Sequence, residues 1–181
     1  NNKFINIPKD KMDEFYQLYY NSGITGNSTD EHKYLAEMVD EKFRLYFDID
    51  YEDDIPFTDI DELVEVIKEV TNSRDIYVIG NENVNNDVVK TGMHVHCHDI
   101  IVTLEECLEF RQKLIDELDQ NSLLNYIQWI KFIDEQAYNN IRMLGSRKVT
   151  KDIDKGNVYR VMYKTDDVEG VDLLKKVSCR I

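Results

Sequence analysis

The chain has 181 residues, and its 36 acidic against 22 basic side chains give a formal net charge of −14. A hydrophobic content of 42% is enough to fill a core of this size, while only 2 prolines and 7 glycines argue against linkers and low-complexity tracts. A chain of this charge repels DNA and anionic lipid, which excludes tight binding of either through the overall field of the protein.

The first quarter of the chain predicts two helices followed by a strand. Apolar residues at helical spacing predict a helix over 9–20. Residues 21–30 have the composition of a loop, and a serine or threonine near their end is expected to cap a helix over 31–40. Aromatic and branched residues then dominate 43–51, which predicts a buried strand with carboxylates at its end.

A helix and two strands follow. Thr58 and Asp61 have the spacing of a capping box in front of an amphipathic helix. The apolar run 75–80 predicts a short strand, the polar residues 81–87 predict its turn, and 92–102 predicts a longer strand.

The second half of the chain continues the alternation. A second capping box opens a long helix at Thr103, and another helical stretch is expected around 123–129. Short strand pieces are expected around a turn within 131–146, then a strand at 157–164 and a helix over 171–177. Strands interleaved with helices predict a mixed α+β (α/β) domain built on a mixed sheet.

The cysteines and the apolar runs bear on the cellular compartment. Cys97, Cys107 and Cys179 form no CxxC pair, so the sequence predicts neither a disulfide framework nor a cysteine zinc site, and we expect an intracellular, reducing compartment. No run approaches the roughly 18–20 apolar residues that cross a bilayer, so no membrane partner is expected. The chain starts without Met, and we expect residues 1–181 to be a single domain taken from a longer protein.

The charge is unevenly distributed along the chain. Residues 140–181 carry 10 basic and 6 acidic side chains, so the excess of acid lies in residues 1–139. The net charge therefore conceals a basic C-terminal portion, which offers one face for a nucleic-acid strand.

The first group of candidate residues is the sequence LYFDIDYEDD, which contains Asp48 and Asp50. Alternate side chains of a strand share a face, so the two aspartates project together while Phe47 and Ile49 face the opposite layer. Two such carboxylates repel each other unless a cation lies between them, and hard oxygen ligands suit Mg²⁺ or Mn²⁺. The same pattern is also typical of a solvated acidic strand end.

The second group is the sequence KTGMHVHCHD. Lys90, Gly92, His94, His96 and His98 alternate on one strand face. Neighbouring positions of one strand rarely supply three ligands to one ion, so a zinc site is not favoured. A lysine and a histidine four positions apart, with a glycine between them, suit a polyphosphate instead. We expect His96 and His98 to be structural or rim residues.

The third group is the sequence FIDEQAYNNIRMLGSRK. Asp134 follows an apolar pair, as Asp48 does, and Arg142 and Lys148 share a face if the strand is regular. Taken alone, this segment favours a hairpin with exposed cations.

The three groups together form a coherent set. Asp48, Asp50 and Asp134 are three carboxylates that would hold two divalent ions. Cationic and polar side chains would neutralise a triphosphate, as in two-metal phosphoryl or nucleotidyl transfer. No Walker A loop and no GxGxxG motif is present, so the phosphate site must be built from side chains: Lys90, His94, Arg142 and Lys148.

At these residues the sequence resembles the archaeo-eukaryotic primase (AEP) superfamily, and within it the primase-polymerases and the primase domains of large DNA virus primase-helicases. The hhhDhD strand of the family falls on LYFDID, and its Lys followed by Ser-x-His falls on Lys90 and His94. Gly92 stands at the serine position, so the hydroxyl contact to the nucleotide phosphates is missing or is supplied elsewhere, for example by Thr91. The third motif of the family corresponds to Asp134, Tyr138, Asn139 or Asn140, Arg142 and Lys148.

The resemblance implies an AEP catalytic core, in which an α/β unit is fused to an RRM-like unit with the active site between them. It implies a DNA primase, or primase-polymerase, that performs template-directed nucleotidyl transfer to make or extend primers. The three aspartates would be catalytic and would bind two Mg²⁺ or Mn²⁺ ions. Lys90 and His94 would grip the triphosphate of the incoming nucleotide, and Arg142 and Lys148 would add positive charge around it.

The resemblance also implies partners. These are a single-stranded DNA template, nucleoside triphosphates and a helicase domain in the same full-length chain. Abundant Asn, Ile, Lys and Asp suit an AT-rich genome such as that of a large DNA virus, whose replication site is the host cytoplasm or nucleus. The net charge leads us to expect that this domain alone binds DNA weakly and in a salt-sensitive way.

Three other functions are consistent with parts of the pattern. A haloacid-dehalogenase-type phosphatase begins with a strand and DxD, but Glu52 stands where Thr or Val is usual, and Lys90 and His94 would have no role. A DxD glycosyltransferase would leave Asp134 and Arg142 without one. The non-enzymatic alternative is a catalytically inactive primase-fold module that binds nucleic acid or a helicase, and the complete set of carboxylates argues against it.

Overall fold

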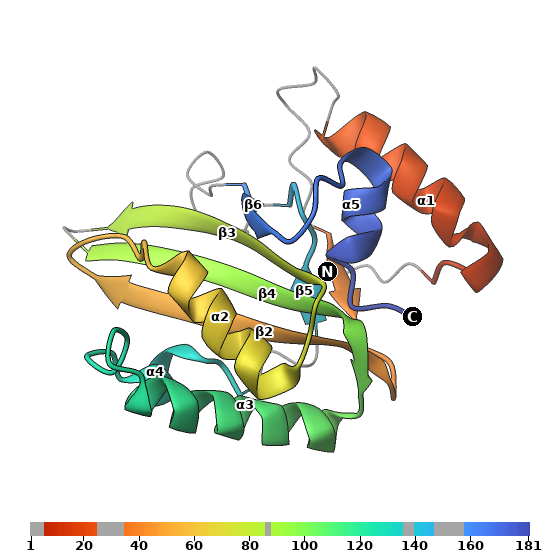
Figure 1. Cartoon of the computed structure of the whole chain (residues 1–181). Coiled ribbons are helices and arrows are strands. Elements are labelled where there is room, and N and C mark those ends of the chain that lie inside the picture. Colours follow the sequence, from red (N-terminus) through yellow and green to blue (C-terminus); the bar gives the residue numbers. More distant parts are fainter. Residues whose placement is uncertain (1–5, 25–34, 86–87, 136–139, 147–157) are drawn as a thin grey trace.

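The computed structural model of the chain describes residues 6–24, 35–85, 88–135, 140–146 and 158–181. None of the described helices has the length and apolar character needed to cross a membrane. In chain order the elements (Figure 1) are the 3₁₀ turn η1 (Lys9–Lys11), α1 (Met12–Tyr19), the π-helical turn η2 (Tyr20–Ile24), β1 (Ala36–Met38), β2 (Phe43–Asp53), α2 (Ile60–Thr71), β3 (Ile76–Asn85), β4 (Val88–Val102), α3 (Leu104–Gln120), α4 (Trp129–Phe132), β5 (Asn140–Arg142), β6 (Arg160–Lys164) and α5 (Gly170–Lys176).

A four-stranded sheet with the strand order β2-β4-β3-β6 is the centre of the fold, and β1 and β5 form a separate two-stranded ladder. Every strand pair in the described ranges is antiparallel, so the expectation of a mixed sheet is wrong. The expected α+β class is confirmed, since helices and antiparallel sheets make up the domain. Antiparallel neighbours need only short connections, and β3 and β4 accordingly pair as consecutive strands.

The two faces of the four-stranded sheet carry different side chains. Odd-numbered positions in the middle of β2 and β4, such as Phe47, Ile49 and Val95, are fully buried in a core that they share with α2 and α3. Figure 1 shows these two helices on the same side of the sheet. Because strand side chains alternate, the even-numbered positions, which include Asp48, belong to the opposite face.

A second apolar cluster covers part of that opposite face. It joins Tyr77 and Ile79 of β3 to side chains of α1 and α5, together with Tyr159. α1 and α5 lie beside each other, away from α2 and α3 (Figure 1). This second cluster does not include the even-numbered polar residues Asp50 and Glu52 of β2 and Lys90 of β4, whose side chains are partly exposed.

The helices expected near residues 9–20, 62–70, 103–118 and 171–177 are confirmed. α3 begins with the predicted capping box, because Thr103 Oγ1 accepts from the Glu106 backbone N–H and the Glu106 carboxylate accepts from the Thr103 N–H at 2.7 Å. α2 begins differently. Its N-cap residue is Asp59 and no side-chain cap is formed, so the predicted capping box at Thr58 is wrong.

Strand pairing overrides local propensity at three places where the sequence prediction is wrong. Ala36–Met38, expected within a helix over 31–40, pairs with β5 as a strand, and 31–34 lie outside the described residues. β2 continues through Asp53, so the carboxylates expected at its end lie within it. The polar residues 81–85, expected to turn, extend β3 against β4.

The segment between α3 and β5 also differs from its prediction. Residues 122–127 form turns rather than a helix, and α4 follows where a strand piece was expected. The pairing expected here is reduced, in the described residues, to one isolated antiparallel bridge between Ile133 and Ile49. Residues 136–139 lie outside the described residues.

Candidate active site

The register of β2 against β4 brings two of the three predicted groups together. Directly opposite residues of an antiparallel pair project from the same face. The aspartates of β2 therefore stand beside the lysine and histidine of β4, on the sheet face turned away from α2 and α3. In this register Asp48 pairs with His94, Asp50 with Gly92, and Glu52 with Lys90.

Asp48 is a largely buried carboxylate, and the described residues leave one of its oxygens without a hydrogen bond. Its side chain is 16% exposed, and Oδ1 has no hydrogen bond within the described residues; the closest imidazole atom, Nε2 of His94, is 3.6 Å away. Burial in the first place, and then the charges of Asp50 and Asp134, raise the pKa of Asp48 to about 7. A buried acceptor without a donor costs about 1–3 kcal/mol, and strongly shifted groups of this kind concentrate at functional sites.

Asp50 is paired, in contrast to Asp48. Lys90 Nζ lies 2.6 Å from Asp50 Oδ2 and 3.3 Å from Glu52 Oε1. Burial lowers the pKa of Lys90, but its hydrogen bonds and charge interactions with the two carboxylates outweigh burial and raise that pKa. The ammonium group that was expected to grip a triphosphate therefore neutralises two carboxylates in this arrangement.

Asp134 reaches the site from the open edge of β2. Next to the bridge between Ile133 and Ile49, the Asp134 backbone N–H donates to the Asp48 carbonyl oxygen at 2.9 Å. Arg111 of α3 fixes this segment, because its Nε and Nη2 donate to the Ile133 carbonyl oxygen at 3.0 and 2.7 Å. The third predicted carboxylate is thus brought beside the first.

His94 is buried beneath the ring of Tyr159. The two rings stack with their centroids 4.4 Å apart and their planes at 24°, and His94 is 1% exposed. Burial first, and then His96 and Arg142, lower the pKa of His94 well below its ordinary value. A neutral imidazole donates one hydrogen bond but adds no positive charge, so His94 cannot neutralise a triphosphate as the sequence prediction required.

Arg142 ends β5 and contacts the site through Tyr159. Its Nη2 donates to the Tyr159 hydroxyl oxygen at 2.7 Å, and its guanidinium carbon lies 5.2 Å from the ring centroid. The positive charge of Arg142 also acts on Asp48, whose pKa it lowers. The expected cation is therefore present, held by an aromatic residue that no motif includes.

The fit of a metal ion depends on the carboxylates. Within the part of the chain that the structure describes, no three His, Cys, Asp or Glu side chains are gathered so as to hold one ion. Asp48 and Asp50 nevertheless supply the oxygen ligands that Mg²⁺ and Mn²⁺ prefer, and Asp48 Oδ1 is a buried acceptor without a hydrogen bond among the described residues. Lys90 already holds a positive charge beside Asp50. These residues fit a divalent cation.

A comparison with protein families agrees with this geometry. A family model described as the C962R protein N-terminal AEP domain matches residues 2–164. The chain belongs to the archaeo-eukaryotic primase superfamily. No curated protein matches it. As an AEP domain, the chain is a primase-like module of the nucleotidyl-transfer type in general terms.

Two positions of the AEP motifs need separate comment. The suggestion that Thr91 supplies the missing serine hydroxyl is wrong. Its side chain is fully buried on the α2 and α3 side of the sheet, where its hydroxyl accepts from the Phe57 N–H at 3.1 Å. Lys148, together with Tyr138 and Asn139, lies outside the described residues. β5 ends at Arg142, so the regular strand expected to align Arg142 with Lys148 is not formed.

Several residues of the candidate site do not belong to any of the AEP motifs. Glu52 shares Lys90 with Asp50, Arg111 holds the Ile133 carbonyl, and Tyr159 holds Arg142. Glu52 could have been found from the alternation of β2, because it continues the face of the two aspartates. No local signal marks Arg111 or Tyr159.

His96 and His98 take the places expected for structural and rim residues. His96 is buried beside His94, and burial lowers its pKa to about 3. His98 is half-buried, and burial lowers its pKa as well.

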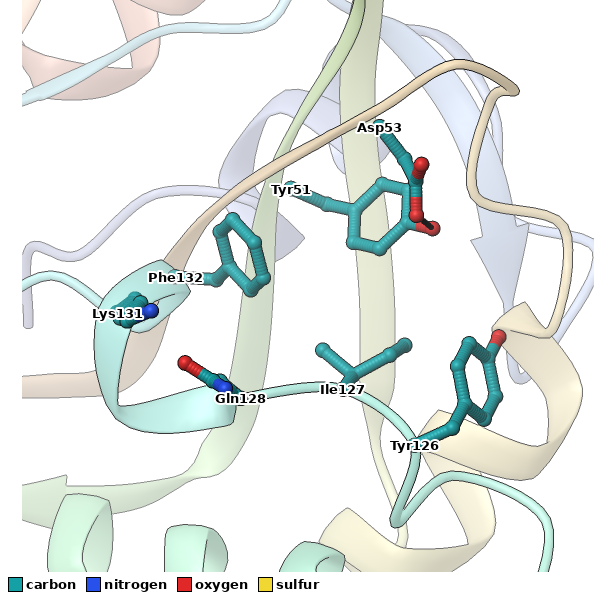
Figure 2. Close-up of a pocket in the computed structure, with 7 residues that line it drawn as sticks. All are labelled: Tyr51, Asp53, Tyr126, Ile127, Gln128, Lys131 and Phe132. Carbon is teal, nitrogen blue, oxygen red and sulfur yellow. Dashed lines mark hydrogen bonds between the residues drawn. The ribbon is translucent and has the colours of Figure 1, made fainter.

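Seven residues line a pocket of about 290 Å³ (Figure 2). Its lining comes from the end of β2 and from 126–132, and it includes Tyr51, whose hydroxyl donates to Asp53 at 2.9 Å. Tyr51 alternates with Asp50 along β2 and therefore faces the other side of the sheet. The pocket contains none of the described AEP motif residues.

Proposed function

We propose that this AEP domain catalyses metal-dependent, template-directed nucleotidyl transfer and so makes or extends primers for DNA replication. The register of β2 against β4 carries the proposal, because it sets Asp48 and Asp50 beside Lys90 and His94 on one surface. Acidic metal ligands next to phosphate-binding groups are what this reaction requires. Membership of the AEP superfamily supports the same reaction class.

Each residue has a proposed role. Asp48, Asp50 and Asp134 would hold two Mg²⁺ or Mn²⁺ ions, which when bound supply Lewis-acid activation of the primer 3′-hydroxyl and charge stabilisation at the leaving pyrophosphate. Arg142, and Lys90 once it leaves Asp50, bind the triphosphate as cations. His94 contributes a neutral hydrogen bond. Lys148 completes the proposed set.

The proposal extends to partners and compartment. The substrates would be a single-stranded DNA template and nucleoside triphosphates, and a helicase domain would follow in the full-length chain. The compartment would be intracellular and reducing, at a viral replication site in the host cell. Family membership supports the template and the nucleotides in general terms.

Incorporation of labelled nucleotide on a single-stranded template, with and without a primer, tests the proposal. We expect template-dependent incorporation with Mg²⁺ or Mn²⁺ and none with EDTA. Asp134→Ala should reduce the rate more than about 100-fold, since loss of a direct ligand exceeds the 10–100-fold effect of losing outer partners. Asp119→Ala, at an exposed position of α3, is the matched control and should be fully active.

Two results would contradict the proposal. A folded wild-type chain without incorporation under any metal would favour the inactive nucleic-acid or helicase-binding module. Full activity in Asp134→Ala would reject the site assignment.

A further inference from the structure

Tyr159 lies in the middle of the candidate site, although no motif includes it. Its backbone pairs with the end of the β5 segment, because Gly145 N–H donates to the Tyr159 carbonyl oxygen and Tyr159 N–H donates to the Ser146 carbonyl oxygen. The residue is 2% exposed and packs in the second apolar cluster. Packing on His94 therefore fixes where its hydroxyl stands.

The hydroxyl of Tyr159 keeps a proton to donate. Its oxygen accepts from Arg142 Nη2, and a guanidinium group has no lone pair to accept the phenolic proton in return. No hydrogen bond from this proton is found within the described residues. The Nε–H of Arg142 is a second buried donor without a hydrogen bond in the same part of the structure. Two adjacent donors, one of them on a permanent cation, are the chemistry of an anion-binding group.

Gly92 brings the backbone of β4 close to this hydroxyl. A Cβ atom at position 92 would lie 3.3 Å from Asp50 Oδ1, 3.4 Å from Asn81 Oδ1 and 3.6 Å from the Tyr159 hydroxyl oxygen. The glycine thus lies in close contact with the Asp50 carboxylate on one side and near the Tyr159 hydroxyl on the other. A side chain here would place its first atoms against the Asp50 carboxylate and beside the Tyr159 hydroxyl.

We propose that Tyr159 binds the triphosphate of the nucleotide through its hydroxyl, together with Arg142, and supplies a contact that Gly92 cannot make. The inference rests on the proposed function and names a substrate-binding residue for it. Burial raises the pKa of Tyr159, so the phenol keeps its proton at neutral pH. The stacked ring also holds the neutral imidazole of His94 in place.

Tyr159→Phe tests the proposal, because it keeps the ring on His94 and removes only the hydroxyl. Binding of dATP and dCTP in the presence of Mg²⁺ is measured by calorimetry. We expect both to bind about 10-fold more weakly, the effect of one hydrogen bond to a charged group. The two losses should be equal because the contact is to phosphate. The melting temperature should fall modestly, because Arg142 Nη2 loses its acceptor, and affinity is therefore compared at a temperature at which both proteins are fully folded.

A rescue variant makes the test specific. Gly92→Ser in the Tyr159→Phe background places a hydroxyl next to the position of the one that was removed, and it should recover most of the affinity for the two nucleotides. Gly92→Ala in that background is the matched control, since it adds the same Cβ without a hydroxyl, and it should recover none.

The results separate the inference from the proposed function. If the wild-type chain binds no nucleoside triphosphate, the proposed function fails together with the inference. If it binds and Tyr159→Phe binds equally well, or loses affinity for one base only, the inference alone is wrong. Should Tyr159→Phe not fold, Arg142→Gln must weaken both nucleotides equally, because it removes the charged donor beside the hydroxyl, and unchanged affinity would overturn the inference.

Discussion

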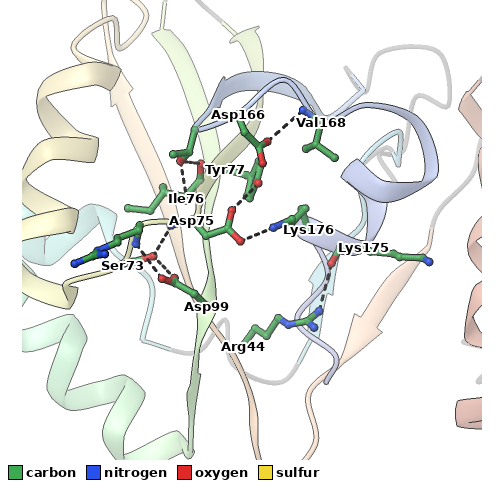
Figure 3. Close-up of polar contacts among 12 residues, drawn as sticks. Arg44, Ser73, Asp75, Ile76, Tyr77, Asp99, Asp166, Val168, Lys175 and Lys176 are labelled. Atoms are coloured by element: carbon green, nitrogen blue, oxygen red, sulfur yellow. Dashed lines mark hydrogen bonds and ion pairs between the residues drawn. The ribbon is translucent and has the colours of Figure 1, made fainter.

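Two aspartates on the same face of the four-stranded sheet show opposite electrostatics. Asp75, just before β3, accepts from the Tyr77 hydroxyl at 2.6 Å and from Lys176 of α5 (Figure 3). Burial raises the pKa of Asp75, but these hydrogen bonds outweigh it and lower the pKa below its ordinary value. The Asp48 side chain is 16% exposed against 22% for Asp75, but it lies deeper among other side chains, and there burial prevails and raises its pKa.

This difference indicates that the polar cluster around Asp75 stabilises the fold, whereas the cluster around Asp48 is suited to binding a ligand. Around Asp75 the polar groups fasten α5 to the sheet: Lys176 pairs with Asp75, and Arg44 Nη1 donates to the Lys175 carbonyl oxygen at 3.3 Å (Figure 3). Around Asp48, no neighbour among the described residues donates a hydrogen bond to carboxylate oxygen Oδ1. Paired charges stabilise the folded chain, whereas an unpaired buried charge persists where a bound group compensates for it.

The largest expected effect comes from Asp48→Asn. Incorporation should fall more than about 100-fold, as for loss of a direct metal ligand. Stability at pH 8 should stay equal or rise, because the folded-state pKa of about 7 exceeds the ordinary 3.8 and the ionised form of Asp48 therefore destabilises the native chain. Urea unfolding at pH 8 beside the incorporation assay measures both. A clear loss of stability would make Asp48 a structural residue and remove the contrast with Asp75.

The opposite pattern is expected for Asp75→Asn. Its neutral amide cannot serve Lys176 and Tyr77 as a carboxylate does, so the free energy of unfolding should fall by about 1–3 kcal/mol. The incorporation rate per folded molecule should not change, because Asp75 lies outside the candidate site. Lys113→Met, at an exposed position of α3, controls for the loss of a surface charge. A loss of activity without a loss of stability would contradict the division between the two clusters.

Much of the candidate site follows from the period of two along a strand. That period alone places Asp48 and Asp50 on one face, and Lys90, Gly92 and His94 on another shared face. Their mutual register is a contact between distant segments, and no local pattern specifies it. The structure shows that the two faces are one surface.

The rest of the site depends on packing that the sequence pattern does not contain. The β-bridge between Ile133 and Ile49 positions Asp134 at the site. Arg111, on a helix that contains no motif residue, donates to the Ile133 carbonyl oxygen and stabilises this bridge. Tyr159 arrives through its pairing with Ser146. A capping serine or threonine led to the prediction of a helix over 31–40, yet tertiary hydrogen bonds hold Glu37 in a strand.

A third prediction concerns Glu37, a buried carboxylate that is paired yet still has a raised pKa. Burial raises the pKa above the ordinary 4.5, although hydrogen bonds from Ser178 and the Cys179 N–H act in the opposite direction. The folded chain thus holds a proton that the unfolded chain releases, so this group stabilises the fold below pH 4.5 and that stability is lost as the pH rises towards the folded-state pKa. The loss is about 1.4 kcal/mol per pH unit in that window.

Glu37→Gln should abolish this component of the pH dependence. Its free energy of unfolding should therefore decline less than that of the wild type as the pH is raised from 4.5. Urea unfolding at several pH values measures the two profiles. Parallel profiles would show that Glu37 keeps an ordinary pKa and that its hydrogen bonds compensate for burial as fully as those of Asp75.

The smallest effect is expected for a change at Lys90, and it tests whether the ammonium group of Lys90 lies where a divalent cation would bind to Asp50. Its Nζ is 2.6 Å from Asp50 Oδ2, on side chains about one third exposed, so the pair contributes at most about 1 kcal/mol. If Lys90 competes with a divalent ion, Lys90→Met should raise the affinity for Mn²⁺ in the absence of nucleotide by about 2–5-fold. Titration followed by electron paramagnetic resonance measures it, with Lys131→Met as the matched control. Weaker Mn²⁺ binding in Lys90→Met would mean that the lysine supports the metal site instead, and that Asp50 is paired for the fold in the way that Asp75 is.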